Sequence, residues 1–203
     1  MSTTLLIVII TGITSFLALD NRELFYKLRL SPYDIIHKKQ YYRVLSHALL
    51  HANFPHLLVN MFVLYSFGGA VENIYSEMWG QSGKIYFILL YITGAIVSCL
   101  PALLKHKNNI YYSAVGASGA VAAVVSSFII FYPWQKLYLF LLIPIPAIIF
   151  GVIYVAYSWY MAKRDSSLIA HDAHLAGTIW GFLFPILLDS KVTTIFIANL
   201  LNF

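Results

Sequence analysis

The amino-acid sequence predicts an all-α, polytopic membrane protein with six transmembrane helices. Of its 203 residues, 60% are hydrophobic and only 10% are charged. A soluble domain carries about 25% charged residues, so this chain has too few to cover a surface that faces water. Its apolar residues also fall in continuous runs without strand-like alternation, which favours membrane-spanning helices over barrel strands.

Six apolar segments come close to the roughly 20 residues that a transmembrane helix needs. The predicted spans are residues 3–19, 55–75, 85–104, 114–132, 137–160 and 173–188. Pro144 and Pro146 fall inside the fifth span and predict a kink there. The apolar tail, residues 192–203, either extends the last helix or lies at the membrane interface. We expect a single domain, residues 1–203, whose first apolar run is retained because no signal-peptide cleavage site follows it.

The connectors between the spans exclude other classes of protein. The longest, residues 20–45, mixes basic with aromatic and aliphatic residues, which is typical of a segment at the membrane interface. A formal net charge of +5 does not indicate nucleic-acid binding, because no basic stripe with interleaved aromatic residues is present. Lys and Arg instead fall in connectors, as is usual in membrane proteins. The single cysteine, Cys99, permits no intrachain disulfide.

Polar side chains inside a membrane span are costly and therefore indicate function. In this chain they gather in three places. These are residues 46–60 at the start of the second span, residues 116–120 at the start of the fourth and residues 170–181 at the start of the sixth. Even-numbered spans all cross in the same direction, so the three places lie towards the same side of the membrane.

The residue types in these three places suit acyl transfer by a serine. A serine hydroxyl needs a base to become a nucleophile, and histidine is the usual base. Ser118 and His174 can face each other if the fourth and sixth spans pack closely. His56 and Asn60, four residues apart on one helical face, can donate hydrogen bonds to the oxyanion that forms. Small residues near the site would allow the close packing, namely Gly116, Gly119, Gly177 and Gly181.

The same residues also have purely structural interpretations. A serine in a membrane helix often bonds a carbonyl one turn back, and glycines often serve only close helix contact. His47 and His51 lie near a helix end, where histidines often sit at the headgroup level. The remaining histidines are expected on the surface or in loops: His37, His106 and His171. Two deep histidines, an asparagine and a glycine-flanked serine on one side of the membrane together favour catalysis.

The ordered set of motifs resembles the rhomboid family of intramembrane serine proteases. The family's GxSG nucleophile motif matches residues 116–119, its AHxxG motif matches residues 173–177, and its HxxxN pattern matches residues 56–60. A common pattern before that helix is matched by Arg43, His47 and His51.

The resemblance implies a role for each matched residue. Ser118 would be the nucleophile, His174 the general base and acid, and His56 and Asn60 the oxyanion-stabilising residues. Asp172 lies two residues before His174 on another face, so we predict a dyad rather than a triad. The implied architecture is the compact six-helix prokaryotic type. The implied partners are the lipid bilayer and transmembrane protein substrates, which the enzyme would cut in or near their membrane segments.

The sequence departs from the family in its first loop and beside the predicted base. The long connector lacks the family's Trp-Arg pair. Many members carry a tyrosine one turn after the serine that stacks on the catalytic histidine, whereas this chain has Ala122. Tyr111, Tyr112 or a residue of the fifth span are candidates to replace that packing.

The orientation and location of the chain are expected from the resemblance. Lys and Arg are concentrated on the side of the long connector, which by the positive-inside rule would place that side in the cytoplasm. The resemblance implies the opposite, a cytoplasmic N-terminus and an active site that faces outward. We follow the resemblance, and expect a multi-pass protein of a prokaryotic inner (plasma) membrane.

Two other functional classes are the alternatives. A non-catalytic rhomboid-like protein would bind membrane proteins without cutting them, and absence of the serine or the histidine would indicate it, but both are present. A histidine-rich transporter or metal-binding protein would use five of the histidines: His47, His51, His56, His171 and His174. No HExxH motif or cysteine partner lies near them, so we expect neither a metal nor another cofactor.

Overall fold

The computed structural model describes residues 1–139, 142–163 and 170–202, within which the chain is mainly helical. Three of the helices described are long and apolar enough to cross a membrane: α1 (Thr3–Asp20), α5 (Phe54–Trp79) and α6 (Ser82–His106). A fourth crossing results if α9 (His171–Leu188) and α10 (Lys191–Leu201), bent by 118° to each other, are counted as one. Two shorter apolar helices are α7 (Ser118–Phe131) and α8 (Ala147–Ala162).

Each predicted span overlaps one of these helices, but several boundaries differ from the prediction. The fourth span becomes helical at Ser118 rather than at residue 114, because Gly116 just before it has a φ of +135°, outside the helical range. The apolar tail does not extend the last span. Helix α9 ends at Leu188 and α10 turns away from it.

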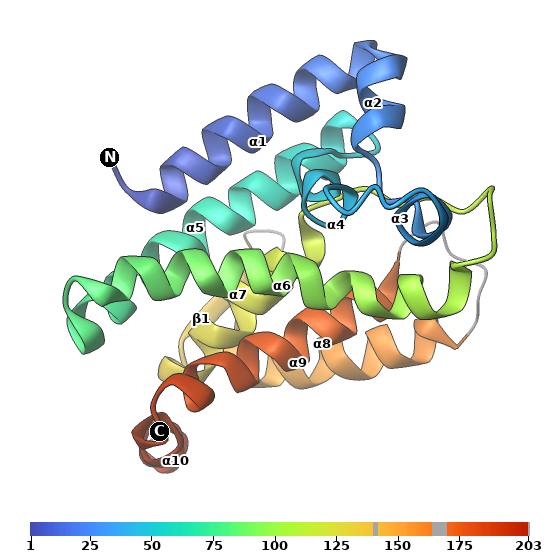
Figure 1. The fold of residues 1–203 in the computed structure, drawn as a ribbon. Coiled ribbons are helices and arrows are strands. Elements are labelled where there is room, and N and C mark those ends of the chain that lie inside the picture. The colour runs from blue at the N-terminus through green and yellow to red at the C-terminus, as the bar shows by residue number, and fades with distance from the viewer. Residues whose placement is uncertain (140–141, 164–169, 203) are drawn as a thin grey trace.

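The long connector folds into short helices. They are α2 (Arg22–Leu28), α3 (Pro32–His37), α4 (Arg43–Ser46) and the 3-10 helix η1 (His47–Leu49). Side-chain caps begin two of them: Asn21 accepts from the Leu24 amide, and Ser31 accepts from the Asp34 amide. Figure 1 shows α2, α3 and α4 gathered at one end of the molecule and α10 at the other.

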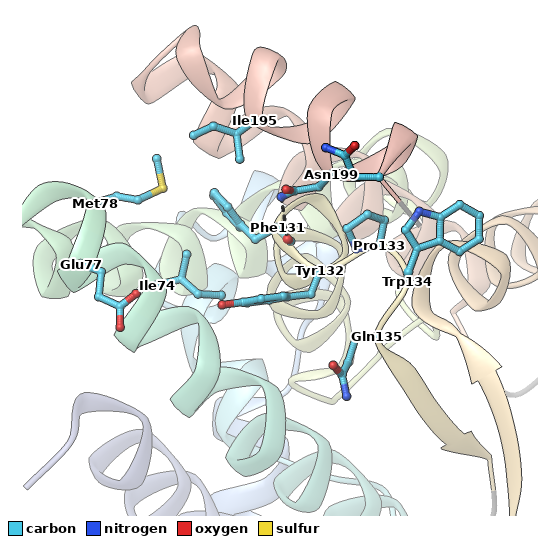
Figure 2. A pocket seen from close by; sticks show the side chains of 11 residues that line it. Ile74, Glu77, Met78, Phe131, Tyr132, Pro133, Trp134, Gln135, Ile195 and Asn199 are labelled. Atoms are coloured by element: carbon cyan, nitrogen blue, oxygen red, sulfur yellow. Dashed lines mark hydrogen bonds between the residues drawn. The ribbon is translucent and has the colours of Figure 1, made fainter.

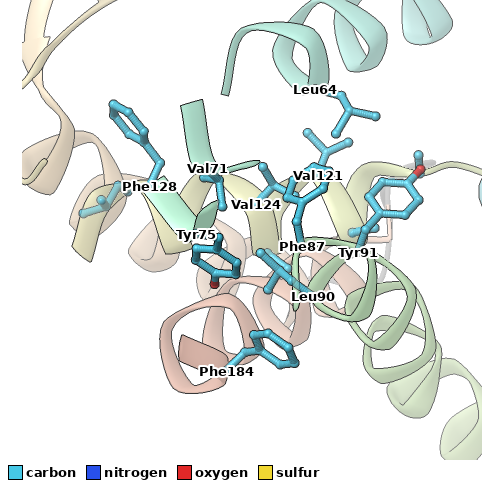
Figure 3. Packing of buried hydrophobic residues seen from close by; sticks show 14 of the residues in the cluster. Leu64, Val71, Tyr75, Phe87, Leu90, Tyr91, Val121, Val124, Phe128 and Phe184 are labelled. Carbon is cyan, nitrogen blue, oxygen red and sulfur yellow. The ribbon is translucent and has the colours of Figure 1, made fainter. Parts of the chain in front are cut away.

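Helix α7 lies at the centre of the packing and contacts α5, α6, α8 and α9. Nearly all of its residues are buried, as expected for a helix that is apolar on every side. The apolar core forms where the neighbouring helices meet it (Figure 3). Side chains drawn there are Leu64, Val71 and Tyr75 of α5, Phe87 and Leu90 of α6, Val121, Val124 and Phe128 of α7, and Phe184 of α9.

The fifth predicted span is helical only in its second half. Its first half forms an antiparallel hairpin of β1 (Lys136–Leu139) and β2 (Ile143–Pro146). The predicted kink at Pro144 and Pro146 is therefore wrong, because these residues lie in a hairpin, whereas the chain as described is mostly helical, as predicted. Proline has no amide hydrogen to donate and favours extended backbone in the residue before it. The Ile-Pro-Ile-Pro run accordingly forms a strand, and α8 begins directly after it.

A buried carboxylate that the sequence analysis did not single out fastens α1 to α5. Glu72 is 3% exposed and accepts hydrogen bonds from Thr3 N (2.7 Å), Thr4 N (2.9 Å) and Thr4 Oγ1 (2.8 Å). The first amides of a helix lack partners within it and attract negative charge, so a carboxylate is well satisfied there. Farther along α1, buried Thr11 and Ser15 are small enough for close approach to neighbouring helices.

Candidate active site

Ser118, the first residue of α7, meets His174 in the first turn of α9. The Ser118 Oγ and His174 Nε2 are 2.7 Å apart and share a hydrogen bond, and both side chains are partly exposed. The two residues lie 56 positions apart in the chain, so the contact exists only because the two helices pack together. A hydroxyl bonded to an imidazole is the arrangement that activates serine as a nucleophile.

Glycines allow α7 and α9 to approach closely enough for this contact. A Cβ on Gly177 would overlap the carbonyl of Gly119, and a Cβ on Gly181 would overlap the carbonyl of Ala123 one turn farther along. Gly119 also lies against Ser98 of α6, whose side chain a Cβ on Gly119 would overlap. The helices therefore cross where their residues are smallest, and a larger side chain would push Ser118 and His174 apart.

Gly116 lies between His56 and Ser118 in a backbone conformation that favours glycine. Its φ is +135°, and its amide donates to the His47 carbonyl at 3.1 Å. A Cβ on Gly116 would lie 3.1 Å from His56 Cε1 and 3.6 Å from Ser118 Oγ. The His56 ring and the Ser118 hydroxyl thus flank the same glycine.

His56 and Asn60 lie one turn apart at the start of α5. Asn53 caps the start of this helix, and its Oδ1 accepts from the His56 amide at 2.9 Å. Asn60 is buried, and its Nδ2 donates to the His56 carbonyl at 2.9 Å. A second N–H remains on the Asn60 amide. The structure therefore brings His56 next to the serine and places Asn60 one turn deeper on the same helix.

Arg43 and His47 hold the long connector together next to this site. Arg43 is buried and donates to the carbonyls of Tyr26 at 2.9 Å and Arg29 at 2.8 Å. His47 Nδ1 lies 3.2 Å from the Arg43 carbonyl. Burial lowers the pKa of His47 to about 4, so its imidazole is neutral at pH 7.

His51 supports the His56 ring. It is buried within the protein rather than exposed at the headgroup level, and its Nδ1 shares a 3.2 Å hydrogen bond with Ser15 of α1. Its ring meets the His56 ring edge-on with 5.0 Å between centroids. Burial, followed by the charge of His56, lowers the pKa of His51 to about 3. A neutral His51 therefore lies between α1 and the first turn of α5.

Tyr154 of α8 is the residue that packs on the His174 ring. The two ring centroids are 6.1 Å apart and the planes are inclined by 24°. The other candidates from the sequence lie elsewhere: Tyr111 is 88% exposed, and Tyr112 stacks on His106 at 3.7 Å. Nothing in the sequence singles out Tyr154 among the aromatic residues of the fifth span, because the contact depends on how α8 lies against α9.

The expectation that His171 lies in a loop or on the surface is wrong. This residue begins α9 and is 5% exposed, because its ring packs edge-on against Tyr157 of α8 at 5.4 Å and against His174 at 5.9 Å. Asp172 points elsewhere and accepts from Lys105 Nζ at 3.1 Å. Among the residues that the structure describes, no carboxylate forms a hydrogen bond with His174.

The histidines near the site do not form a metal centre in the described part of the chain. Within it, no three His, Cys, Asp or Glu side chains are arranged to hold a metal ion. Zinc sites in proteins normally use three or four such ligands. The histidines instead contact one another through their rings, in the pairs His51–His56 and His171–His174.

A groove at the opposite end of α7 takes no part in this arrangement. It encloses about 460 Å³ between the ends of α5 and α7 and helix α10 (Figure 2). Asn199 of α10 lies on one side, where its Nδ2 donates to the Phe131 carbonyl at 2.8 Å. Phe131 ends α7 and Ser118 begins it, so the length of the helix separates the groove from the serine.

Comparison with known proteins shows a family to which the chain is similar. The family model of the Rhomboid domain matches residues 38–191, a range that contains Ser118, His174, His56 and Asn60. RHOMBOID-like protein 12, mitochondrial, of Arabidopsis thaliana is 27% identical over 149 residues, covering 66% of this chain and 42% of the relative. Rhomboid protein 1, mitochondrial, of Saccharomyces cerevisiae is 31% identical over 146 residues, covering 70% and 40%. Rhomboid protease GluP of Bacillus subtilis is 25% identical over 149 residues, covering 73% and 26%. The chain thus spans less than half of the length of each of these relatives.

Proposed function

Because the chain belongs to the rhomboid family, we propose that it is an intramembrane serine endopeptidase that cuts transmembrane proteins. The observation that carries the proposal is the 2.7 Å hydrogen bond between Ser118 Oγ and His174 Nε2 in an integral membrane protein. The relatives support it, since one of them is named as a rhomboid protease.

His174 acts in turn as base and acid. Its Nε2 accepts the hydroxyl proton while Ser118 Oγ attacks the scissile carbonyl carbon and forms a new C–O bond. His174 then gives this proton to the amine as the C–N bond breaks, which leaves an acyl-enzyme. Water attacks the ester with His174 taking its proton, and the proton returns to Ser118 Oγ as the acid product leaves.

The oxyanion that forms at each step is stabilised by donors around Ser118. The His56 ring lies beside the serine, and the free N–H of Asn60 is one turn away on α5. The serine also begins α7, where unpaired backbone amides and the helix dipole favour negative charge. One prearranged donor of this kind contributes roughly 2.7–4 kcal/mol to catalysis.

The short length of α7 supports a position of this chemistry within the membrane. Its 14 residues extend about 21 Å, whereas the hydrocarbon core of a bilayer is about 30 Å thick. If α7 reaches one surface with its C-terminal end, Ser118 lies inside the bilayer, below the connector helices α2–α4. Peptide bonds in or near the transmembrane segments of other proteins are the substrates that reach this depth.

The membrane architecture proposed with this activity is a single domain, residues 1–203, with six spans. Helices α1, α5, α6, α7, α8 and α9 would cross the bilayer, α7 and α8 over part of its thickness, and α10 would lie along one surface. We propose a cytoplasmic N-terminus and a prokaryotic plasma membrane. Rhomboid protease GluP of Bacillus subtilis is in keeping with that location, and the two mitochondrial relatives make an organelle membrane the alternative.

Covalent labelling of the serine tests the proposal. The purified protein in detergent, with a chelator and no added metal, should cleave a model transmembrane substrate and react with a fluorophosphonate probe at Ser118. Ser118→Ala should abolish both signals, and His174→Ala should nearly do so.

A second serine of the same helix is the matched control. Ser126 is buried on α7 and its hydroxyl donates to the Ala122 carbonyl at 2.7 Å, which is a purely structural role. Ser126→Ala should keep both signals. Full cleavage by Ser118→Ala would end the protease proposal, and a wild-type protein that neither reacts nor cleaves would favour a non-catalytic role in binding membrane proteins.

A further inference from the structure

A column of three stacked rings runs from α8 onto the imidazole of His174. Phe150 and Tyr154 lie one turn apart on the same face of α8, and their ring centroids are 5.9 Å apart with planes inclined by 16°. Tyr154 and His174 continue the column at 6.1 Å and 24°. His171 meets His174 edge-on at 5.9 Å. The imidazole of His174 therefore has ring neighbours in two directions.

Contacts with α7 and with the residues just after it fix the position of α8, and so the position of this column of rings. The first amides of α8, Ala147 N and Ile148 N, donate to the carbonyls of Gln135 at 2.9 Å and Pro133 at 2.8 Å, just beyond the end of α7. Near its middle, a Cβ on Gly151 would lie 2.9 Å from Ile129 Cδ1 of α7. The position of Tyr154 along the bundle is thus set by α7, the same helix that carries Ser118.

The His174 ring needs such a neighbour because one hydrogen bond does not fix its plane. The contact between Nε2 and Ser118 Oγ is a single attachment, and rotation about the side-chain bonds of His174 could still turn Nε2 away from the hydroxyl. In a triad, a carboxylate on the other nitrogen removes this freedom. Here Asp172 is bound to Lys105, and within the described ranges no carboxylate forms a hydrogen bond with His174.

We propose that Tyr154 is a positioning residue for the reaction, which holds the His174 imidazole in the plane that keeps Nε2 on Ser118 Oγ. This inference rests on the proposed protease function. Aromatic rings with centroids 4.5–7 Å apart attract each other in offset stacks, and a stack on the ring face resists the rotation that would turn Nε2 away. The aromatic ring performs this role and the phenolic hydroxyl does not.

Replacement of the ring should lower the rate of the chemical step. In Tyr154→Leu, kcat for a transmembrane substrate and the rate of fluorophosphonate labelling at Ser118 should both fall by about three- to tenfold, with KM nearly unchanged. Tyr154→Phe should restore both rates to within about twofold of wild type. The matched control is Tyr65→Leu, the same change at a tyrosine of α5 that is 61% exposed, which should leave both rates unchanged.

The outcomes separate this role from the protease function and from a loss of folding. Wild-type rates in Tyr154→Leu, or a loss confined to KM, would overturn the role of Tyr154 and leave the protease proposal standing. Equal losses in Tyr154→Phe and Tyr154→Leu would overturn the role of the ring. A wild-type protein that is not labelled at Ser118 would contradict both proposals. Unfolding midpoints in detergent identify a variant that has lost its fold. If Tyr154→Leu has lost its fold, the two rates of Tyr154→Phe test the proposal, and a fall in either would overturn it.

Discussion

Replacing Gly177 with alanine should separate Ser118 from His174 without touching either side chain. The added Cβ would lie 2.8 Å from the carbonyl carbon of Gly119, whereas ordinary contact begins at 3.4 Å. The two backbones must therefore part by at least about 0.6 Å, because the Gly119 oxygen lies closer still to the added Cβ and backbone atoms have no alternative rotamer to adopt. Gly119 follows Ser118 directly, so the separation passes straight to the proposed catalytic pair.

The expected loss follows from that displacement. The Ser118–His174 distance of 2.7 Å would grow to at least roughly 3.3 Å, at or beyond the limit of a hydrogen bond. A misplacement of about 1 Å costs roughly a hundredfold in rate, so a separation of at least about 0.6 Å should lower kcat by about tenfold or more. Overpacking of this kind also costs about 1–3 kcal/mol of stability.

The assay is turnover of a transmembrane substrate in detergent, with the labelling rate of Ser118 and the unfolding midpoint measured on the same samples. Gly69→Ala is the matched control, because Gly69 of α5 has nothing within 4 Å of its would-be Cβ. That variant should keep wild-type turnover. If Gly177→Ala turned over at the wild-type rate with an unchanged midpoint, the close crossing of α7 and α9 would not be what brings the dyad together.

Three further predictions concern the residues around the dyad. Asn60→Ala should lower kcat by about a hundredfold, the loss of one oxyanion donor, with little change in the unfolding midpoint; a change in KM alone would contradict its role. Arg43→Ala should cost about 2–4 kcal/mol of stability by leaving carbonyls of the connector without their charged donor, whereas the exposed Arg22→Ala should cost less than about 0.5 kcal/mol. Burial lowers the pKa of His47 to about 4. Between pH 4 and about 6.5, the folded protein therefore binds fewer protons at His47 than the unfolded chain does. The stabilising contribution of His47 is therefore complete above pH 6.5 and declines by about 3 kcal/mol towards pH 4. His47→Gln should make this loss of stability on acidification less steep, as followed by unfolding midpoints at several pH values, and an unchanged slope would show that His47 does not titrate in this range.

Much of the site was accessible from local sequence patterns. Ser118 and His174 stand out because polar groups are rare in apolar spans and because glycines flank both. Membership in the rhomboid family, expected from the order of these motifs, is confirmed by the match over residues 38–191. The roles of Ser118, His174, His56 and Asn60 stay predictions.

Two predictions from the sequence were wrong: the helix at the start of the fifth span and the exposure of His171. Residues 136–146 are apolar enough for a helix, but the prolines at 144 and 146 form a strand of a hairpin instead. A short apolar run does not distinguish strand from helix by composition alone. His171 was expected on the surface or in a loop, yet packing against Tyr157 buries it.

Composition and the spacing of apolar, glycine and polar residues along the chain are enough to predict a helical membrane protein and its candidate site residues, because these signals act between near neighbours. Which rings and carbonyls surround those side chains is decided by the crossing of α7, α8 and α9. Tyr154 reaches His174 from 20 positions away, and Gly177 meets Gly119 from 58 positions away. Contacts of this kind depend on how far each helix is shifted along its neighbour, and that shift is set by the packing of all the side chains together.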